Sequence, residues 1–105
     1  KLVEPHDAWA DDETLAAGVE SFQGIINAPV DRMVSNWAGL RSFAPDGNLV
    51  IGPDRTNPSF FWFAGQGGYG FQTTAAASQL LCDLFIGRKV SIEDETLQAL
   101  LPGRF

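Results

Sequence analysis

Residues 60–86 constrain the fold more than any other part of the chain. The apolar run at residues 60–64 has the length and composition of a buried strand. It leads directly into residues 65–70, where four of the six residues are glycine. An apolar stripe with helical spacing follows over residues 71–86. Because glycine permits dihedrals and close approaches that other residues do not, we expect a tight strand-to-helix turn here.

The glycine-rich loop has the form of a dinucleotide-binding fingerprint but lacks its context. Gly65, Gly67 and Gly70 satisfy G-x-G-x-x-G. In a Rossmann unit a second strand follows, ending in an acidic residue about 20 positions on, whereas here a short helix that begins with acidic residues comes next. A small NAD-binding protein is therefore disfavoured. The loop could still present backbone N–H groups to an anion, and a structural turn without a ligand explains the glycines equally well.

The remaining patterns predict about three strands and about three helices in total. Acidic residues followed by an apolar stripe indicate a helix over residues 11–26. Residues 31–44 are apolar at both strand parities, which predicts a long, largely buried strand. Residues 49–51 are expected to form a short strand, and residues 91–101 a last short helix. The predicted fold class is α/β, or α+β if this piece stands alone.

Charge and residue usage exclude several functional classes. Thirteen acidic and seven basic residues give a net charge of −6, so nucleic acid is not an expected partner. One cysteine and one histidine cannot form a disulfide or a Cys/His zinc site, and no metal site is predicted. No apolar run reaches about 18 residues, so we expect no integral membrane segment and a cytoplasmic location. Cys82 is expected in the core and His6 at the surface.

Arg41 is the second candidate for a functional role. It shares strand parity with Trp37 and Phe43, which would surround its guanidinium with apolar groups. A desolvated arginine pairs most strongly with a carboxylate, through two parallel hydrogen bonds. The alternative, which the residues alone favour, is an exposed arginine or one that is paired with an acid of this chain.

Four short motifs follow one another along the chain: Trp37-Ala38-Gly39-Leu40-Arg41, Pro45-Asp46-Gly47, Ile51-Gly52, and Gly65-Gln66-Gly67-Gly68-Tyr69-Gly70-Phe71. Their order and spacing, over roughly residues 9–90, resemble the C-terminal part of the D-amino-acid oxidase superfamily of FAD-dependent oxidoreductases. The similarity is greatest to the D-arginine dehydrogenase-like and glycine oxidase-like branch.

This resemblance implies a parent enzyme that oxidises a D-amino acid, glycine or a related amine to the imino acid by hydride transfer to FAD. It implies substrate binding by Arg41, at the carboxylate, and by Gly68. It assigns the flavin contacts to Gly67, Gly68, Tyr69, Gly70, Phe71, Gln72 and Thr73. It assigns no catalytic residue. Some relatives attach the flavin through a cysteine that precedes the glycine motif, and because Cys82 follows it, noncovalent FAD is expected.

The family's FAD fingerprint on its first strand is absent from this chain. Residues 1–105 are therefore expected to be a C-terminal segment, with a substrate-domain strand at 31–44 and an FAD-domain strand, loop and helix at 60–87. The expected partners are a small-molecule substrate and the missing N-terminal FAD-binding part of the same protein. Self-association of the fragment is also expected, and the fragment alone is expected to be inactive. The alternative function is a non-catalytic binding or assembly module in which the glycine loop is only a turn.

Overall fold

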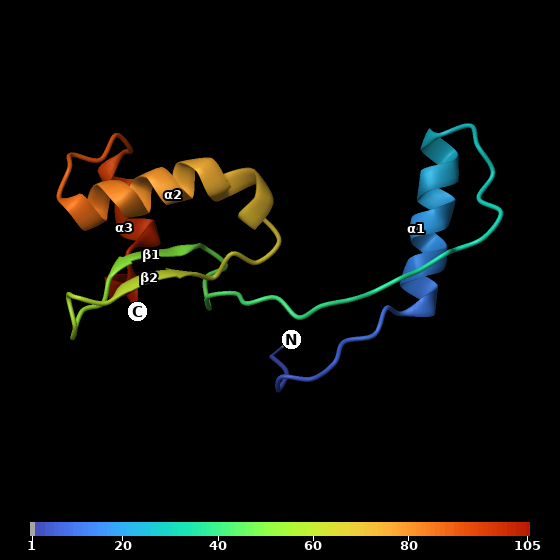
Figure 1. Ribbon diagram of the computed structural model, residues 1–105, viewed down its shortest axis with the longest axis horizontal. Coiled ribbons are helices and arrows are strands. Elements are labelled where there is room, and N and C mark those ends of the chain that lie inside the picture. Colours follow the sequence, from blue (N-terminus) through green and yellow to red (C-terminus); the bar gives the residue numbers. More distant parts are fainter. Residues whose placement is uncertain (1) are drawn as a thin grey trace. The chain divides into compact units, whose positions relative to one another are not determined.

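The structure, a computed structural model, describes residues 2–105, which divide into two compact units, Lys1–Leu40 and Arg41–Phe105 (Figure 1). The first unit contains one helix, α1 (Asp12–Ile25). The second contains strands β1 (Val50–Pro53) and β2 (Phe61–Ala64), helices α2 (Gly70–Ile86) and α3 (Asp94–Leu100), and a 3-10 turn, η1 (Pro102–Arg104). Three helices and an antiparallel sheet confirm the mixed helix and strand character, with two strands instead of three. None of the described helices is long and apolar enough to cross a bilayer.

Helix α1 begins and ends where the sequence predicts. The Asp11 carboxylate caps it by accepting hydrogen bonds from the Thr14 backbone N–H and hydroxyl, both at 2.8 Å. These two bonds lower the pKa of Asp11. Leu15 and Val19 of the predicted stripe are half-buried, and no residue within α1 is buried. The apolar face of this helix is thus largely open.

The strand predicted over residues 31–44 is wrong for this structure. Residues 29–44 adopt no helix or strand, and their large side chains are exposed, Trp37 to 83% and Val34 to 84%. A strand needs a neighbour to satisfy its backbone N–H and C=O groups, and within residues 2–105 no strand lies beside this segment. Apolar composition on both parities indicated a buried strand, but it could not supply the pairing partner.

The second unit is built on a two-stranded antiparallel sheet covered by α2 on one face. Val50 pairs with Ala64, and Pro53 pairs with Phe61. Ile51 is fully buried against Ala77 and Leu80 of α2. Helix α3 and neighbouring loops complete this small core with Val90, Ile92, Leu97 and Leu100. The apolar run at residues 60–64 predicted a buried strand, but Trp62 and Phe63 of β2 are exposed, and among the described residues β2 pairs only with β1.

Both ends of α2 agree with the sequence, while one of its side chains does not. Gly87 caps the C-terminus in the left-handed conformation (φ 70°), as a glycine at this position predicts. Cys82 is exposed and does not belong to the core. In the predicted helix Cys82 lies next to the apolar stripe. In the structure its side chain is exposed. His6 is exposed, as expected.

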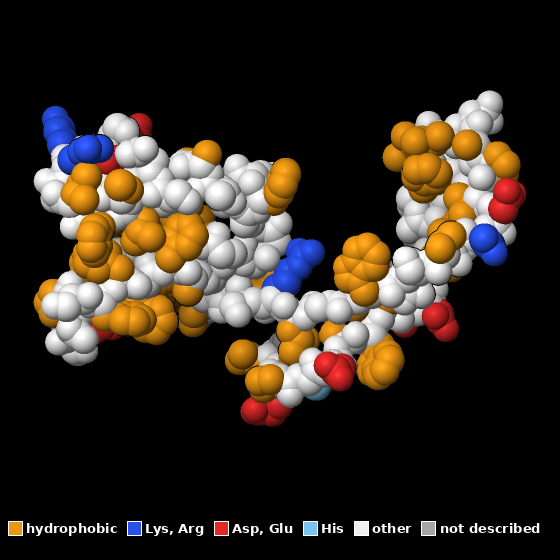
Figure 2. Space-filling model, in the orientation of Figure 1, with side chains coloured by type: hydrophobic (Ala, Val, Ile, Leu, Met, Phe, Trp, Pro, Cys, Tyr) orange, Lys and Arg blue, Asp and Glu red, His pale blue; other side chains and the backbone are white. Residues whose placement is uncertain are grey.

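Apolar side chains remain exposed on the second unit. Phe71 is fully exposed, Phe85 is 69% exposed, and Trp62 and Phe63 are close to 40%. Figure 2 shows such side chains gathered over the sheet and α2. Exposed apolar patches of this kind commonly mark surfaces that contact another chain or domain.

Candidate functional site

Two segments of the second unit run side by side, residues 41–44 and the glycine loop at residues 65–68. The Gly67 backbone N–H donates to the Ser42 carbonyl at 3.0 Å. A Cβ atom placed on Gly65 would lie 3.5 Å from the Ala44 backbone nitrogen. The two segments therefore lie antiparallel and in close contact, although neither is a regular strand.

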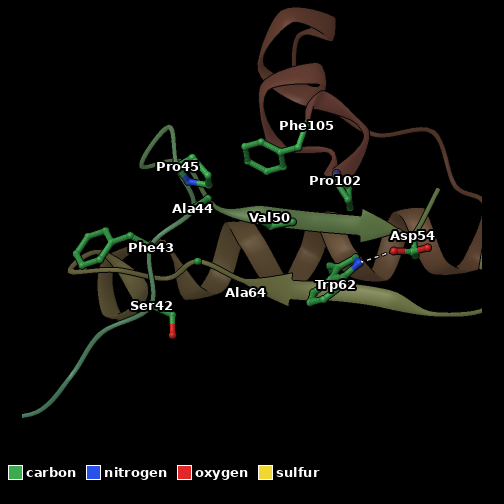
Figure 3. A pocket seen from close by; sticks show the side chains of 11 residues that line it. Ser42, Phe43, Ala44, Pro45, Val50, Asp54, Trp62, Ala64, Pro102 and Phe105 are labelled. Carbon is green, nitrogen blue, oxygen red and sulfur yellow. Dashed lines mark hydrogen bonds between the residues drawn. The ribbon is translucent and has the colours of Figure 1, made fainter. Parts of the chain in front are cut away.

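Gly67 provides the space for an aromatic ring. Its φ is 49°, and a Cβ atom placed there would lie 2.6 Å from Cε1 of Phe43. The ring thus occupies the volume that any other side chain would fill. Figure 3 shows the Phe43 ring beside the chain that leaves β2 after Ala64. The site needs glycine at this position both for its dihedral and for this close approach.

Gly68 lies against the guanidinium of Arg41. A Cβ atom placed on Gly68 would lie 2.9 Å from Nη1 of Arg41. Arg41 is exposed, and within residues 2–105 its guanidinium forms neither a salt bridge nor a hydrogen bond to this chain. Of the sequence alternatives, the structure therefore shows the exposed arginine and not the one paired with an internal acid. The apolar surroundings expected from strand parity are not found, because residues 31–44 form no strand and Trp37 is itself exposed. The structure thus brings together the two residues that the resemblance assigns to the substrate.

Helix α2 begins immediately after this pair. Tyr69 is its N-cap residue and makes no side-chain capping bond, and the Tyr69 N–H donates to the Gln66 carbonyl at 3.0 Å. The first backbone N–H groups of a helix have no intrahelical acceptor. Tyr69, Phe71 and Gln72 are exposed, while Gly70 and Thr73 are half-buried. The N-terminal end of α2 therefore offers N–H donors and a positive dipole end next to Arg41 and Gly68.

A mainly apolar pocket of about 390 Å³ lies on the sheet face opposite α2. It is lined by Val50, Trp62 and Ala64 of the sheet, by residues 42–45, and by Pro102 and Phe105 (Figure 3). The Trp62 indole N–H donates to Asp54 at 3.0 Å, and that bond together with bonds from Thr56 and Asn57 lowers the pKa of the Asp54 carboxyl. Asp54 therefore fixes the loop between the strands and the orientation of Trp62.

The C-terminal turn is held to the turn before β1 by an ion pair. Arg104 donates to both carboxylate oxygens of Asp46, at 2.7 Å and 3.1 Å. The Arg104 guanidinium also lies 4.4 Å from the centre of the Phe105 ring. The Arg104 bonds lower the pKa of Asp46 to about 2. The turn that follows residues 41–44 is thus bonded to the C-terminal turn of the second unit.

Comparison with known proteins decides the family. Residues 3–84 match the family described as "DAO: FAD dependent oxidoreductase". The chain belongs to the DAO family. The match includes the whole glycine loop and most of α2, together with the segment that carries Arg41.

Two DAO-family relatives show the extent of the similarity. A "D-amino acid dehydrogenase" of Agrobacterium fabrum is 34% identical over 85 residues, covering 81% of this chain and 20% of the relative. A protein of the same name from Cereibacter sphaeroides is 36% identical over 96 residues, covering 88% and 21%. The chain therefore spans about a fifth of the length of these curated relatives.

Sequence reasoning missed several residues around the site. Phe43 and Ser42, which contact Gly67, directly follow the arginine motif, and this adjacency was the available signal. Arg104 pairs with Asp46 across 58 positions, and no local pattern indicates such a contact. The candidate flavin residues 67–73 run from the glycine loop into the first turn of α2.

Proposed function

We propose that this chain forms the carboxylate-binding and flavin-contacting part of an FAD-dependent enzyme that oxidises a D-amino acid, glycine or a related amine to the imino acid. The observation that carries this proposal is the position of the Arg41 guanidinium against Gly68, directly before α2. The membership in the DAO family and the two D-amino acid dehydrogenase relatives support it.

In this proposal Arg41 binds the substrate carboxylate. Its guanidinium is exposed and has no acidic partner within residues 2–105, so its donors are available for two parallel hydrogen bonds to a carboxylate. Gly68 has no side chain to cover the guanidinium, and its backbone lines the space beside it. Together they would orient the substrate Cα, because a carboxylate held at two points cannot rotate freely.

The described residues fit a flavin at the N-terminal end of α2. Gly68 is exposed, and the N-terminal end of α2 has no side-chain cap, whereas the side chains of Phe43 and Gln66 lie against Gly67 and Gly70. In our proposal residues 67–73 contact the ring, and the α2 N–H groups and dipole favour negative charge near them. When bound, FAD would supply the acceptor for the hydride from the substrate Cα. Cys82 lies in the C-terminal half of α2 and so follows the glycine loop in sequence. This position supports a noncovalent flavin.

We also propose that the rest of the flavin site comes from an N-terminal FAD-binding part of the same protein. The exposed apolar side chains of the second unit, among them Phe71 and Phe63, fit burial against such a part. The 105-residue chain alone should then neither retain FAD on gel filtration nor oxidise amino acids. Stoichiometric FAD binding by the chain alone would contradict this division of the site.

The experiment that tests the proposed reaction compares two substrates in the complete enzyme. One is a D-amino acid and the other is the matching amine without the carboxylate. Arg41→Met should lower kcat/KM for the amino acid by at least about a hundredfold and leave the amine within a few-fold, because only the former loses its partner. Arg41→Lys serves as the control that retains charge but not the two-point geometry. A complete protein that binds no flavin and oxidises neither compound would instead favour the assembly module.

A further inference from the structure

Phe43 is the residue that connects the glycine loop to the segment carrying Arg41. Its ring contacts Gly67, where an added Cβ atom would lie 2.6, 2.8 and 3.3 Å from three ring carbons. Phe43 is 59% exposed, so the contact with Gly67 leaves more than half of its surface open. The ring is therefore attached to the loop and not buried in the core.

The two residues before Phe43 also contact the glycine loop. Ser42 accepts the Gly67 N–H at 3.0 Å, and Arg41 lies against Gly68. Residues 29–44 have no regular secondary structure that could fix Arg41 in place. One hydrogen bond and one aromatic contact are thus the described interactions that hold residues 41–43 on the loop. A single exposed hydrogen bond contributes little net stability, so the ring contact should provide much of the restraint.

We propose that Phe43 is a positioning residue for Arg41: by filling the space left by Gly67 it holds the guanidinium over Gly68. This inference rests on the proposed function, because it gives Phe43 a role in carboxylate binding that it exercises through Arg41. Phe43 need not touch the substrate. Its removal should leave Arg41 chemically intact but free to move away from Gly68, and misplacement of about 1 Å can cost up to a hundredfold.

The first part of the test concerns geometry and uses the 105-residue chain. In NMR spectra, cross-relaxation between the Arg41 side chain and the Gly68 α protons reports their proximity. Phe43→Ala should abolish this signal, while Phe43→Leu, which retains bulk, should keep most of it. Phe60→Ala is the matched control, because Phe60 is similarly exposed, at 49%, and contacts Trp62 and not the loop. An unchanged signal in Phe43→Ala overturns the proposal.

The second part uses the complete flavoenzyme and a double-mutant cycle. Phe43→Ala should weaken binding of a simple carboxylate ligand about ten- to a hundredfold with flavin content unchanged, and Phe43→Leu should restore most of the affinity. In an Arg41→Met background the same change should cost less than about twofold, because Phe43 acts through Arg41. If Phe43→Ala weakens carboxylate binding by the same factor with and without Arg41, Phe43 has a general structural role and the proposal is overturned.

A third result separates this inference from the proposed function. If Arg41→Met leaves carboxylate binding unchanged while Phe43→Ala still abolishes the Arg41 to Gly68 signal, the packing is as described. The proposed function, and with it the role of Phe43 in substrate binding, would then be overturned. If Arg41→Met abolishes binding and Phe43→Ala does not affect it, the proposed function stands and the positioning role alone is overturned.

Discussion

The guanidinium of Arg41 lies directly against Gly68, so close that a Cβ atom on Gly68 would be 2.9 Å from Nη1. The two residues are far apart in sequence and meet because residues 41–44 run beside the glycine loop. The contact places a side chain suited to a carboxylate next to the first turn of a helix. It is the observation in this chain on which the proposed function rests most directly.

Gly68→Ala should impair carboxylate binding without unfolding the protein. The new methyl group would meet the end of a flexible arginine, which can move aside, so the free energy of unfolding should change by less than about 1 kcal/mol. The displaced guanidinium should cost at least about tenfold in carboxylate affinity in the complete enzyme. Urea unfolding and ligand titration measure the two effects. Gly18→Ala, with open space around it in α1, is the control, and equal affinity in both variants would contradict the contact.

Gly52→Ala should destabilise the second unit. Gly52 has φ 131°, and a Cβ atom there would lie 2.8 Å from Cδ2 of Leu101. The dihedral is strained for alanine and the space is filled, so we expect a loss of about 1–3 kcal/mol in the free energy of unfolding. Gly103→Ala, whose Cβ would lie 3.4 Å from Arg55, should cost much less. Equal urea midpoints for the two variants would contradict the close contact between Gly52 and Leu101.

The pair of Asp46 and Arg104 should make stability depend on pH in the acid range. The folded pKa of Asp46 is lowered to about 2 from an ordinary value of 3.8. The stabilisation is therefore complete above about pH 4 and is lost as the pH falls toward 2. Arg104→Gln should flatten the fall in thermal midpoint across this window, while Arg88→Gln, at a side chain 67% exposed, should not. Identical slopes for wild type and Arg104→Gln would contradict the pairing.

Cys82 should react with a thiol reagent in the folded 105-residue chain. Its side chain is exposed on α2, so modification should be complete without denaturant and should not change the circular dichroism spectrum. Cys82→Ala should leave the urea midpoint nearly unchanged. Leu80→Ala, two residues earlier and 6% exposed, should cost about 2–5 kcal/mol. A thiol that reacts only after unfolding would restore the interpretation of Cys82 as a core residue.

The sequence predicts the local elements of this chain well because each has its own signal. The capping Asp11, the apolar run before Gly65 and the terminal Gly87 mark α1, β2 and α2 within a few residues. The strand over 31–44 was wrong because pairing depends on a neighbour that composition does not reveal. The ion pair of Asp46 and Arg104 joins residues 58 positions apart, and only the folded structure brings them together.

The sequence indicated candidate site residues, but it did not indicate how they are arranged. Motif order indicated Arg41 and the loop at residues 65–70. The residues alone favoured an exposed or internally paired arginine, and the structure shows the exposed one. The contact with Gly68 arises because residues 41–44 lie antiparallel to the segment that follows β2, and because Phe43 packs on Gly67. Such tertiary contacts have no periodic signature in the sequence.

The most direct test of the central claim is the dissociation constant of a small carboxylate ligand for the complete flavoenzyme, followed by the change in flavin absorbance. Wild type and Arg41→Met should contain the same amount of FAD, and the variant should bind the ligand at least about a hundredfold more weakly because the two-point ion pair is lost. Equal dissociation constants at equal flavin content would contradict the assignment of Arg41 as the carboxylate anchor.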